Sequence, residues 1–317
     1  YVTSTPIDPI IIDYYLHLLP GITGDHARQR MHFFSCYDTS PVSLTEKILA
    51  RPRLIKRMMN AIPDGHLAHL ACFNVTEHER KLAVTLGLPV YGCNPDLLFW
   101  GTKSGSREIF KECGVDIPFG FENLQNEEQV IKALADLYEN NPLIRKAVIK
   151  MNDGFSGEGN AVFSYQKLSG TEDIESQIRV LLPAEIEIVA SDLSYQQFMH
   201  KLTSMGGIVE AFIDAPEKAS PSVQCRINPL GKIDIISTHD QLMGGRDGQV
   251  FLGGTFPASN EYSIEIASLG KKVSEVMKRK GVMGRFGVDF LSIKENNEWK
   301  HYAIEINLRK GGTTHPY

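Results

Sequence analysis

The chain has 317 residues, of which 42% are hydrophobic and 22% charged, and its formal net charge is −5. This length suits two or three lobes rather than one small core, and the weak negative charge argues against binding to nucleic acid or to an anionic membrane. The five cysteines show no CxxC spacing, which disfavours a disulfide framework or a structural zinc site and fits a reducing compartment such as the cytoplasm. Small molecules are therefore the expected partners, and the sequence leaves a homo-oligomer open.

The first apolar stretch, IDPIIIDYYLHLLPGI, is too short to span a bilayer and is interrupted by Asp8, Asp13 and Pro20. We expect no signal peptide in this region. Because the chain begins with tyrosine rather than methionine, we also expect it to be a fragment of a longer protein.

Residues 30–100 alternate between predicted strands and predicted helices. Strands are expected at 31–38, 66–74 and 88–93. Ser43 with Glu46, and Thr76 with Glu79, have the spacing of capping boxes, in which side chains satisfy backbone N–H groups at the start of a helix. This alternation predicts a small parallel α/β domain.

From about residue 101 the pattern changes. Helices are expected at 104–114, 126–141 and 263–280. Asn126 caps the second of these, and Gly281 ends the third after a basic last turn. The apolar segments between and after them, such as IVEAFID, SVQCRI, KIDIISTH and HYAIEIN, are typical of hairpin strands. We therefore expect a more antiparallel arrangement in this part of the chain.

Two carboxylates are expected on a hairpin near the end of the chain. RFGVDFLSI and HYAIEINLR read as its strands, and Asp289 and Glu305 each lie eight residues from Asn297. An odd-length loop centred on Asn297 would set the carboxylates directly opposite each other, about 5 Å apart. A two-residue turn at Asn296 and Asn297 would instead bring Ile304 opposite Asp289.

Glu305, Asn307 and Arg309 alternate along the second strand and therefore share one of its faces. Polar groups on an inward face need partners. If Glu305 faces Asp289, a divalent cation between them would remove their repulsion, and Asn307 would add a neutral oxygen. An all-oxygen site with few protein ligands favours Mg²⁺ completed by nucleotide phosphates, with Mn²⁺ as a second candidate. The alternative is a solvated strand face.

A glycine-rich loop follows a strand that ends in a lysine. In VIKMNDGFSGEGNAVF, Lys150 precedes Gly154, Gly157 and Gly159. Glycines let backbone N–H groups approach an anion, and the lysine adds positive charge. The segment lacks the GK[ST] ending of a P-loop and the following helix of a dinucleotide fingerprint, so it predicts a strand–loop–strand lid over phosphate. The alternative is a glycine-rich hairpin turn without a ligand.

Two further features are ambiguous by themselves. In GGIVEAFID, Glu210 ends an apolar strand ahead of Phe212, and such a segment could present backbone groups and an apolar wall to an adenine edge. The alternative is an ordinary buried strand. Lys103 precedes a predicted helix and is either a ligand-binding lysine or a surface lysine.

Taken in order, these features resemble the ATP-grasp superfamily of carboxylate–amine ligases over about residues 100–317. The most specific part is the hairpin GVDF…IEINLR, and the pairing of MNDGFSGEGNAV with EINLRKGGTTHPY looks most like the pheganomycin-type peptide ligases. The resemblance implies an α/β (α+β) fold class. It also implies three domains, which are a pre-ATP-grasp α/β domain at 1–100, a first ATP-grasp subdomain with the glycine loop at 101–205, and a second with the metal hairpin at 206–317.

The resemblance further implies roles for individual residues. ATP phosphates would be bound by Lys103, Lys150, Gly154, Ser156, Gly157 and Gly159. Backbone at Glu210 and Phe212 would hold adenine, and Glu217 would hold the ribose. Mg²⁺ would be bound by Asp289, Glu305 and Asn307. The acyl phosphate would be stabilised by Arg309, with Arg226 and Arg285 as further candidates. The substrate would be positioned by His315, with His239 and Asp240 in the same cleft.

The activity implied by the resemblance is ATP- and Mg²⁺-dependent joining of a carboxylate to an amine. ATP would convert the carboxylate to an acyl phosphate, the amine would attack, and ADP and phosphate would be released. Alternatives on the same scaffold are a kinase-type enzyme, a carboxylase, and a nucleotide-binding regulatory module without turnover. No biotin-related element is visible, which disfavours the carboxylase. The acid and amine cannot be named, because pocket loops carry no portable code.

Overall fold

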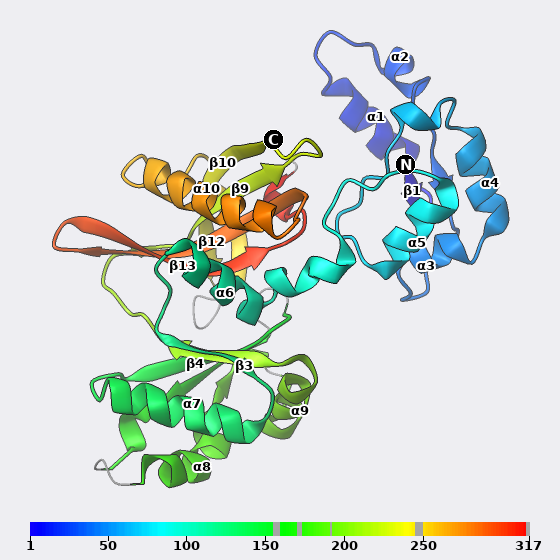
Figure 1. The fold of residues 1–317 in the computed structure, drawn as a ribbon. Coiled ribbons are helices and arrows are strands. Elements are labelled where there is room, and N and C mark those ends of the chain that lie inside the picture. Colours follow the sequence, from blue (N-terminus) through cyan, green and yellow to red (C-terminus); the bar gives the residue numbers. More distant parts are fainter. Residues whose placement is uncertain (155–158, 170–172, 191, 245–249, 315–317) are drawn as a thin grey trace. The chain divides into compact units, whose positions relative to one another are not determined.

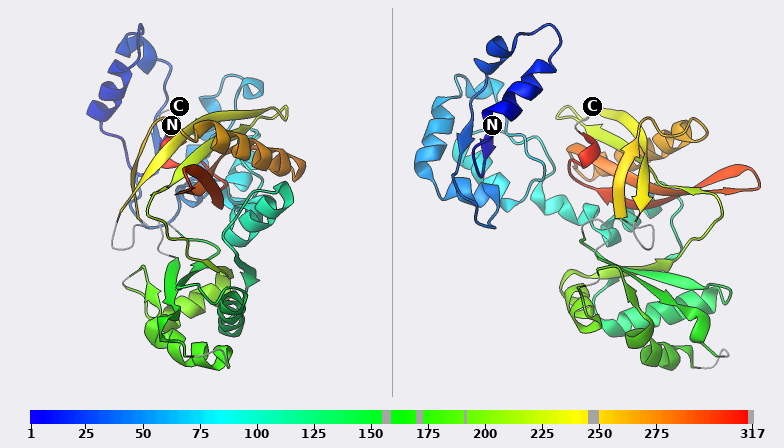
Figure 2. Two further views of the ribbon diagram at one scale, coloured as in Figure 1. Left: turned by 90° about the vertical axis from the view of Figure 1, so that its left-hand side faces the viewer. Right: turned by 180° about the vertical axis from the view of Figure 1, so that it is seen from behind.

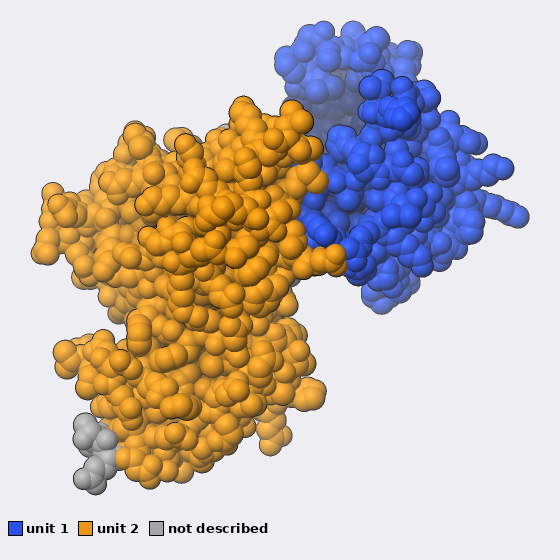
Figure 3. All heavy atoms as spheres, in the orientation of Figure 1, with its two compact units in different colours: residues 1–95 blue, residues 96–317 orange. Residues whose placement is uncertain are grey.

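The chain divides into two compact units. The computed structural model describes residues 1–154, 159–169, 173–190, 192–244 and 250–314. One unit comprises Tyr1–Pro95 and the other Asp96–Tyr317, and Figure 3 colours them separately. The boundary between the units is thus at residue 95, where the sequence suggested residue 100. The predicted division at residue 205 stays a prediction.

The N-terminal unit contains less strand than the sequence suggested. Its two-stranded sheet is parallel, and one further parallel bridge joins Leu70 to Val90. The strands predicted at 66–74 and 88–93 are reduced to this bridge, since Asp64 caps a short 3₁₀ turn where the first of them should begin. The elements are β1 (Val2–Thr3), α1 (Pro9–His17), α2 (Gly24–Arg28), β2 (Phe34–Ser35), α3 (Leu44–Leu49), α4 (Pro52–Asn60), η1 (Gly65–Leu67) and α5 (Glu77–Leu86).

Local capping explains where two of these helices start. Thr76 and Glu79 form the predicted capping box at α5. The Glu79 side chain accepts a hydrogen bond from the backbone N–H of Thr76, and the Thr76 side chain accepts one from the backbone at the start of the helix. Ser43 accepts a hydrogen bond from the backbone N–H of Glu46 at the start of α3. α3, α4 and α5 bury one apolar cluster, which contains Cys36, Ile48, Leu54, Ile55, Met58, Leu82 and Leu86.

The second unit contains two antiparallel sheets. The first has the strand order β3-β7-β4-β5-β6. Figures 1 and 2 show α7 and α8 on the face of this sheet that points away from the other sheet. The elements are β3 (Gly120–Leu124), α7 (Glu127–Asn140), β4 (Lys146–Met151), β5 (Asn160–Ser164), η3 (Tyr165–Lys167), α8 (Ile174–Glu185), β6 (Glu187–Ile188), α9 (Tyr195–Met205) and β7 (Gly207–Ala211).

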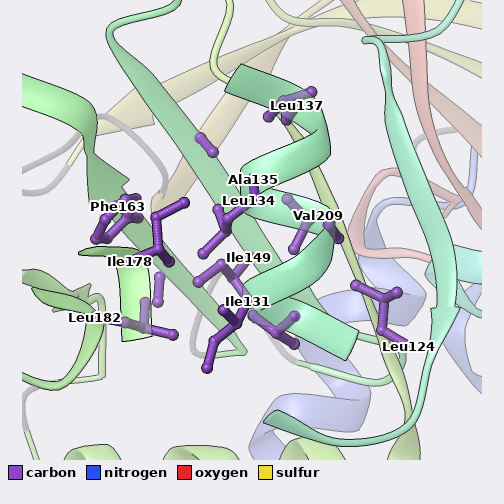
Figure 4. Close-up of a cluster of buried hydrophobic side chains, with 14 of the residues drawn as sticks. Leu124, Ile131, Leu134, Ala135, Leu137, Ile149, Phe163, Ile178, Leu182 and Val209 are labelled. Atoms are coloured by element: carbon purple, nitrogen blue, oxygen red, sulfur yellow. The ribbon is translucent and has the colours of Figure 1, made fainter. Parts of the chain in front are cut away.

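The helices hold this first sheet through a dense apolar core, part of which Figure 4 shows. Leu134 and Ile131 of α7, Ile149 of β4 and Ile178 of α8 are at most 1% exposed. Burying each such side chain contributes about 1.5–3 kcal/mol relative to leaving it in water. This rigid core fixes the strand that carries Lys150.

The second sheet has the strand order β11-β10-β9-β12-β13, and β8 pairs with β12. α10 packs on β9 and β10. The elements are β8 (Lys218–Ala219), β9 (Pro221–Ile227), β10 (Ile233–Gly244), β11 (Val250–Thr255), α10 (Ser263–Arg279), β12 (Gly284–Glu295), β13 (Glu298–Asn307) and η4 (Gly312–Thr314).

The two faces of the second sheet differ in chemistry. A Cβ added to Gly270 of α10 would lie 2.8 Å from Val223 and 3.5 Å from Cys225, so these β9 side chains face the helix. Ser222 and Gln224 therefore face the other way, since side chains alternate along a strand. That opposite, polar face carries the predicted metal ligands.

α6 (Lys103–Cys113), which follows η2 (Pro95–Gly101), connects the two sheets of this unit. It contacts β13 of the second sheet and both β3 and β7 of the first. Its first turns bury Ser104, Ser106 and Arg107, each 2% exposed or less. None of the helices in the described part of the chain has the length and apolar character needed to cross a bilayer.

Candidate active site

The turn of the metal hairpin differs from the predicted one. β12 and β13 are joined by only two residues, Asn296 and Asn297, with φ of 50° and 67°. Positive φ at both positions is typical of the tight hairpin turns that match strand twist, and asparagine tolerates it. The odd-length loop expected from the sequence is therefore wrong. A regular hairpin with this turn would pair Asp289 with Ile304.

A β-bulge restores the pairing of the two carboxylates. Phe290 pairs with Ala303, as the two-residue turn requires, but the register then shifts so that Asp289 pairs with Glu305. Ile304 is the extra residue in the bulge. Bulges re-aim side chains at the cost of one unpaired residue, and this one brings two carboxylates to one face.

Three groups compensate the charge of Glu305 and Asp289. Lys103 at the start of α6 forms an ion pair with one oxygen of Glu305. The amide nitrogen of Asn307 donates to Asp289 at 2.8 Å and to Glu305 at 3.2 Å. Lys150 adds further positive charge near Glu305. At an effective dielectric constant near 20, two carboxylates on directly opposite residues, about 5 Å apart, would repel by about 3 kcal/mol, so their approach requires such partners.

The two carboxylates differ in their electrostatics. Burial, followed by the negative charge of Glu305, raises the pKa of Asp289. Burial acts the same way on Glu305, but Lys103, Lys150 and the hydrogen bond from Asn307 outweigh it and lower the pKa of Glu305. Asp289 is therefore the carboxylate that gains most from a bound cation.

The donor set fits Mg²⁺. Two opposed carboxylates and one amide supply oxygen ligands only, and a small number of protein ligands suits an ion that retains waters and phosphate oxygens. Asn307 would turn its amide oxygen toward the ion, since the two ends of an amide are interchangeable by rotation. Among the described residues no group of three His, Cys, Asp or Glu side chains could hold a metal.

The second predicted lysine lies on the other sheet and is also paired. Lys150 of β4 is 8% exposed, and its Nζ lies 2.6 Å from an oxygen of Glu210 on β7. The other Glu210 oxygen accepts from Arg107 at 2.9 Å. The sequence predicted a backbone role for Glu210 and did not indicate that its side chain holds Lys150.

The described part of the glycine loop closes tightly. A Cβ on Gly154 would lie 3.2 Å from the backbone of Gly159, and the Met151 N–H donates to the Gly159 carbonyl at 2.9 Å. Ser156 and Gly157 lie outside the described residues. The phosphate lid stays a prediction, and the close approach of the two chain segments gives a physical reason for glycine at both ends.

Phe212 and Glu217, which were predicted to contact the nucleoside, differ in their surroundings. The backbone N–H of Phe212 already donates to the Lys146 carbonyl at 3.1 Å, which leaves its carbonyl for a ligand. Glu217 pairs with Lys294 at 3.3 Å, and its side chain is 60% exposed. Lys294 lies one residue from the turn end of β12, five residues from Asp289. The structure thus does not bring Glu217 to the metal ligands, because the β8–β12 pairing holds it at the far end of the hairpin.

The three predicted arginines have different surroundings. Arg226 and Arg285 pair directly across β9 and β12, on the face that carries the metal ligands. Arg226 also donates to Asp234 at 2.7 Å, whereas Arg285 has no carboxylate partner among the described residues. Arg309 donates to the Lys310 carbonyl at 3.2 Å. Two adjacent guanidinium groups on this face are suited to binding an anion.

His239 lies on the site face of β10, and Asp240 does not. His239 pairs with Ser222, which in turn pairs with Asp289. Asp240 is the next residue and points the opposite way, where it accepts hydrogen bonds from Ser259 and the Tyr262 hydroxyl. The predicted substrate role of Asp240 is therefore corrected to a structural one. His315 lies outside the described residues.

Several polar residues on the site face were missed from the sequence. Ser222 and Gln241 act on Asp289 to lower its pKa, against the effect of burial. The Ser237 hydroxyl and the His239 Nδ1 are buried without a hydrogen-bond partner among the described residues. His239 was predicted, whereas Ser222, Ser237 and Gln241 were missed. These three lie within strands that looked ordinary, and only the alternation of polar residues along SVQCR and STHDQ could have indicated them.

A comparison with protein families agrees with this geometry. The family described as IQCH-like, ATP-grasp matches residues 97–188 and 174–311, well over half of the chain. The chain belongs to this ATP-grasp family. The predicted ATP-grasp resemblance is thereby confirmed, and the matched region contains every predicted metal ligand and both predicted lysines.

Two curated relatives align with nearly all of this ATP-grasp chain. It is 29% identical over 324 residues to an L-propargylglycine–L-glutamate ligase of Streptantibioticus cattleyicolor, covering 99% of this chain and 63% of the relative. It is 22% identical over 353 residues to IQ motif-containing protein H of Danio rerio, covering 97% of this chain and 33% of that protein. The chain thus spans less than two thirds of either relative.

Solved structures confirm the fold class. The ADP complex of an N5-carboxyaminoimidazole ribonucleotide synthetase superposes with a TM-score of 0.56 at 13% identity, covering 99% of this chain and 64% of that one. A biotin carboxylase from Campylobacter jejuni gives a TM-score of 0.59 at 15% identity, covering 90% and 57%. At such low identity these likenesses concern the ATP-grasp fold alone.

Proposed function

We propose that this chain catalyses ATP- and Mg²⁺-dependent joining of a carboxylate to an amine, with release of ADP and phosphate. The observation that carries the proposal is the convergence of Asp289, Glu305 and Asn307 with two lysines from other elements. Lys103 pairs with Glu305, and Lys150 is near enough to shift its pKa. Opposed carboxylates beside two lysines are suited to hold a metal–triphosphate. The carboxylates complement the positive charge of the metal, and the lysines complement the negative charge of the phosphates.

The side chains would divide the work as follows. Bound Mg²⁺ would supply charge neutralisation for the phosphates. Lys103 would leave Glu305 and turn to a phosphate oxygen when the cation takes its place on the carboxylate. Lys150 would hold a second phosphate position. Arg309 and the Arg226–Arg285 pair would hold the acid and the negative charge that develops on its carbonyl during phosphoryl transfer and amine attack.

We further propose amino acids or short peptides as the acid and the amine. The ligase from Streptantibioticus cattleyicolor is named for two amino acids, L-propargylglycine and L-glutamate. A pair of adjacent arginines, Arg226 and Arg285, suits the carboxylate of such a substrate. Reaction in the cytoplasm stays a prediction from the cysteine pattern.

Phosphate release tests this proposal. The purified chain is incubated with ATP, Mg²⁺ and pairs drawn from a panel of amino acids and dipeptides, and ADP and phosphate are measured. The ligase is supported if phosphate release requires both an acid and an amine. The product should then have the mass of the acid plus the amine, less one water. ADP formation that needs only a carboxylate, without release of inorganic phosphate and with the phosphoryl group found on the acid, would favour a kinase-type reaction instead.

A nucleotide-binding module without turnover is the second candidate. Its support is that the family description and the Danio rerio relative are named for IQ motif-containing protein H, a name that states no reaction. The complete set of Lys103, Lys150, Asp289, Glu305 and Asn307 speaks against it. Tight MgATP binding with no phosphate release on any substrate pair would favour this module.

A further inference from the structure

A buried ion network links three elements of the second unit. Glu210 of β7 shares its carboxylate between Lys150 of β4, at 2.6 Å, and Arg107 of α6, at 2.9 Å. Each Glu210 oxygen serves one of the two cations. The side chains of Arg107 and Glu210 are 2% and 3% exposed, and that of Lys150 is 10% exposed.

Arg107 is fixed by more than Glu210. Its Nε donates to Glu122 at 3.1 Å, and its Nη1 also donates to the Pro118 carbonyl at 3.0 Å. A planar guanidinium with three such partners has little freedom to move. Glu210 is therefore held in place from the side opposite Lys150.

The position of the Lys150 ammonium group depends on Glu210, whereas Arg107 has other partners that hold it in place. Among the described residues, the ion pair to Glu210 is the single polar contact of the Lys150 ammonium group. Its stem is long and flexible, and its positive charge already acts on Glu305 of the metal hairpin. Without Glu210, the ammonium group would lose the contact that fixes where its charge lies.

We infer that Glu210 is a positioning residue, whose carboxylate holds the Lys150 ammonium group in place for a nucleotide phosphate while Arg107 holds Glu210. This inference rests on the proposed nucleotide site and adds to it. The backbone of Glu210 remains available for adenine, but its side chain acts on the phosphates through Lys150. Each of its oxygens is bonded to a cation, so the side chain acts first on Lys150 and Arg107.

A purely structural role for Glu210 leads to different expectations. β4 and β7 are already joined by backbone pairing, with Val148 opposite Glu210 and Lys150 opposite Ile208. If Glu210 served only to hold these strands together, its loss would lower stability and leave the affinity for phosphate groups unchanged. Nucleotide binding therefore separates the two roles.

The test uses the full chain with the variants Glu210→Gln, Lys150→Met and the double variant. Dissociation constants for MgADP and for adenosine are measured by calorimetry, together with thermal unfolding. Glu210→Gln should weaken MgADP binding about 10-fold or more and change adenosine binding less than about 2-fold. In the Lys150→Met background it should weaken MgADP no further, because a residue that acts through another shows no additional effect once that residue is gone.

A matched control is Glu112→Gln. Glu112 is also a glutamate paired with one arginine and one lysine, Arg279 and Lys280, but it lies at the other end of α6. It should leave the binding of both ligands unchanged. If Glu210→Gln does not fold, Glu210→Asp is used. This variant keeps the negative charge, but its side chain is shorter by one methylene group, so the carboxylate lies farther from Lys150 and Arg107. Weaker MgADP with unchanged adenosine again supports the inference, and no change in either overturns it.

Other results also overturn the inference. Equal weakening of MgADP and adenosine by Glu210→Gln would mean that the side chain contacts the nucleoside. Additive losses in the double variant would mean that it acts independently of Lys150. A stability loss with unchanged MgADP affinity would mean a structural role. Failure of the unaltered chain to bind MgADP would instead overturn the proposed function itself, so the two failures are distinguishable.

Discussion

Glu305 is bonded to Lys103 and Asn307 and lies opposite Asp289. Lysine and amide groups here balance a pair of carboxylates whose mutual repulsion would otherwise destabilise the hairpin. The same carboxylates can exchange these partners for a cation, because ion pairs and metal bonds satisfy the same oxygen lone pairs. At the scale of single residues, the proposed function therefore depends on whether Glu305 can exchange Lys103 for a cation.

Replacing Glu305 with glutamine tests the metal assignment. The variant keeps the shape and removes one negative charge, so we expect a folded protein whose apparent Mg²⁺ affinity falls by about 10-fold or more, or roughly 1.4 kcal/mol. Mg²⁺-dependent phosphate release should disappear. Mg²⁺ titration in the presence of ADP measures the change, and Glu298→Gln, exposed on the same strand, is the control. An unaltered Mg²⁺ requirement in the Glu305 variant would remove Glu305 from the metal site.

Because His239 is buried, we expect the protein to lose stability in acid. Burial lowers the pKa of His239 to about 4 from its ordinary value of 6.5. Between these values the unfolded chain binds a proton that the folded chain does not, so the free energy of unfolding falls as pH falls. From pH 7.5 to pH 5.0 this group should cost about 2 kcal/mol.

Urea unfolding at both pH values checks this expectation. His239→Gln should lose less stability on acidification than the unaltered chain, by about the same 2 kcal/mol. His200→Gln, which changes an exposed histidine of α9, should show the full loss. If His239→Gln were as acid-sensitive as the unaltered chain, His239 would not be the buried neutral group described above.

At the scale of elements, α6 aligns the two sheets through buried polar groups. The Ile306 N–H of β13 donates to the Ser106 hydroxyl at 3.0 Å, and the Asn123 N–H of β3 donates to the Ser104 hydroxyl at 3.0 Å. Both serines are fully buried. The helix that carries Lys103 is thus fixed to the strand that carries Glu305.

Ser106→Ala tests this attachment. The change leaves a buried N–H without its acceptor, which should lower the free energy of unfolding by about 1–3 kcal/mol. Urea denaturation measures it. Ser274→Ala is a matched control, since Ser274 is equally buried but donates to the Gly270 carbonyl of its own helix, and its removal orphans no N–H group. Equal losses of unfolding free energy in both variants would show that the α6–β13 hydrogen bond contributes no more to stability than a hydrogen bond within one helix.

At the scale of the whole molecule, the two units have separate apolar cores. The core around Leu82 and Leu86 belongs to residues 1–95, and the core around Leu134 and Ile149 belongs to residues 96–317. Separate cores allow separate unfolding. Every residue assigned to the metal and the nucleotide lies in the second unit.

Nucleotide binding should therefore stabilise one of two unfolding transitions. MgADP at 100 times its dissociation constant raises the free energy of unfolding of the unit that binds it by about 2.7 kcal/mol. Calorimetric scans with and without MgADP should show the transition of residues 96–317 move up in temperature while the other stays. AMP at the same concentration serves as a control with fewer phosphate contacts. A joint shift of both transitions would mean that the units unfold as one.

The sequence alone determined the order of the elements in the second unit and the helix caps, and it supplied the candidate metal ligands, which stay a prediction. These features are local, because a cap, an alternating strand or a Glu-x-Asn spacing depends on neighbours within a few residues. The opposition of Asp289 and Glu305 was also predicted, but for a loop that does not exist. The bulge that produces it depends on pairing with a neighbouring strand, and no local pattern encodes that choice.

Only the tertiary structure decided the partners of buried charges. Arg107, Glu210 and Lys150 come from three elements that are 43 to 103 residues apart in the sequence. The sequence did not indicate that these three side chains are one another's partners, and Arg107 looked like an ordinary charged residue. A buried carboxylate is tolerated only where cations reach it, and packing of α6 against the sheets brings them there. Likewise, the strand ladder, rather than composition, turned Asp240 away from the face that His239 shares with the metal ligands.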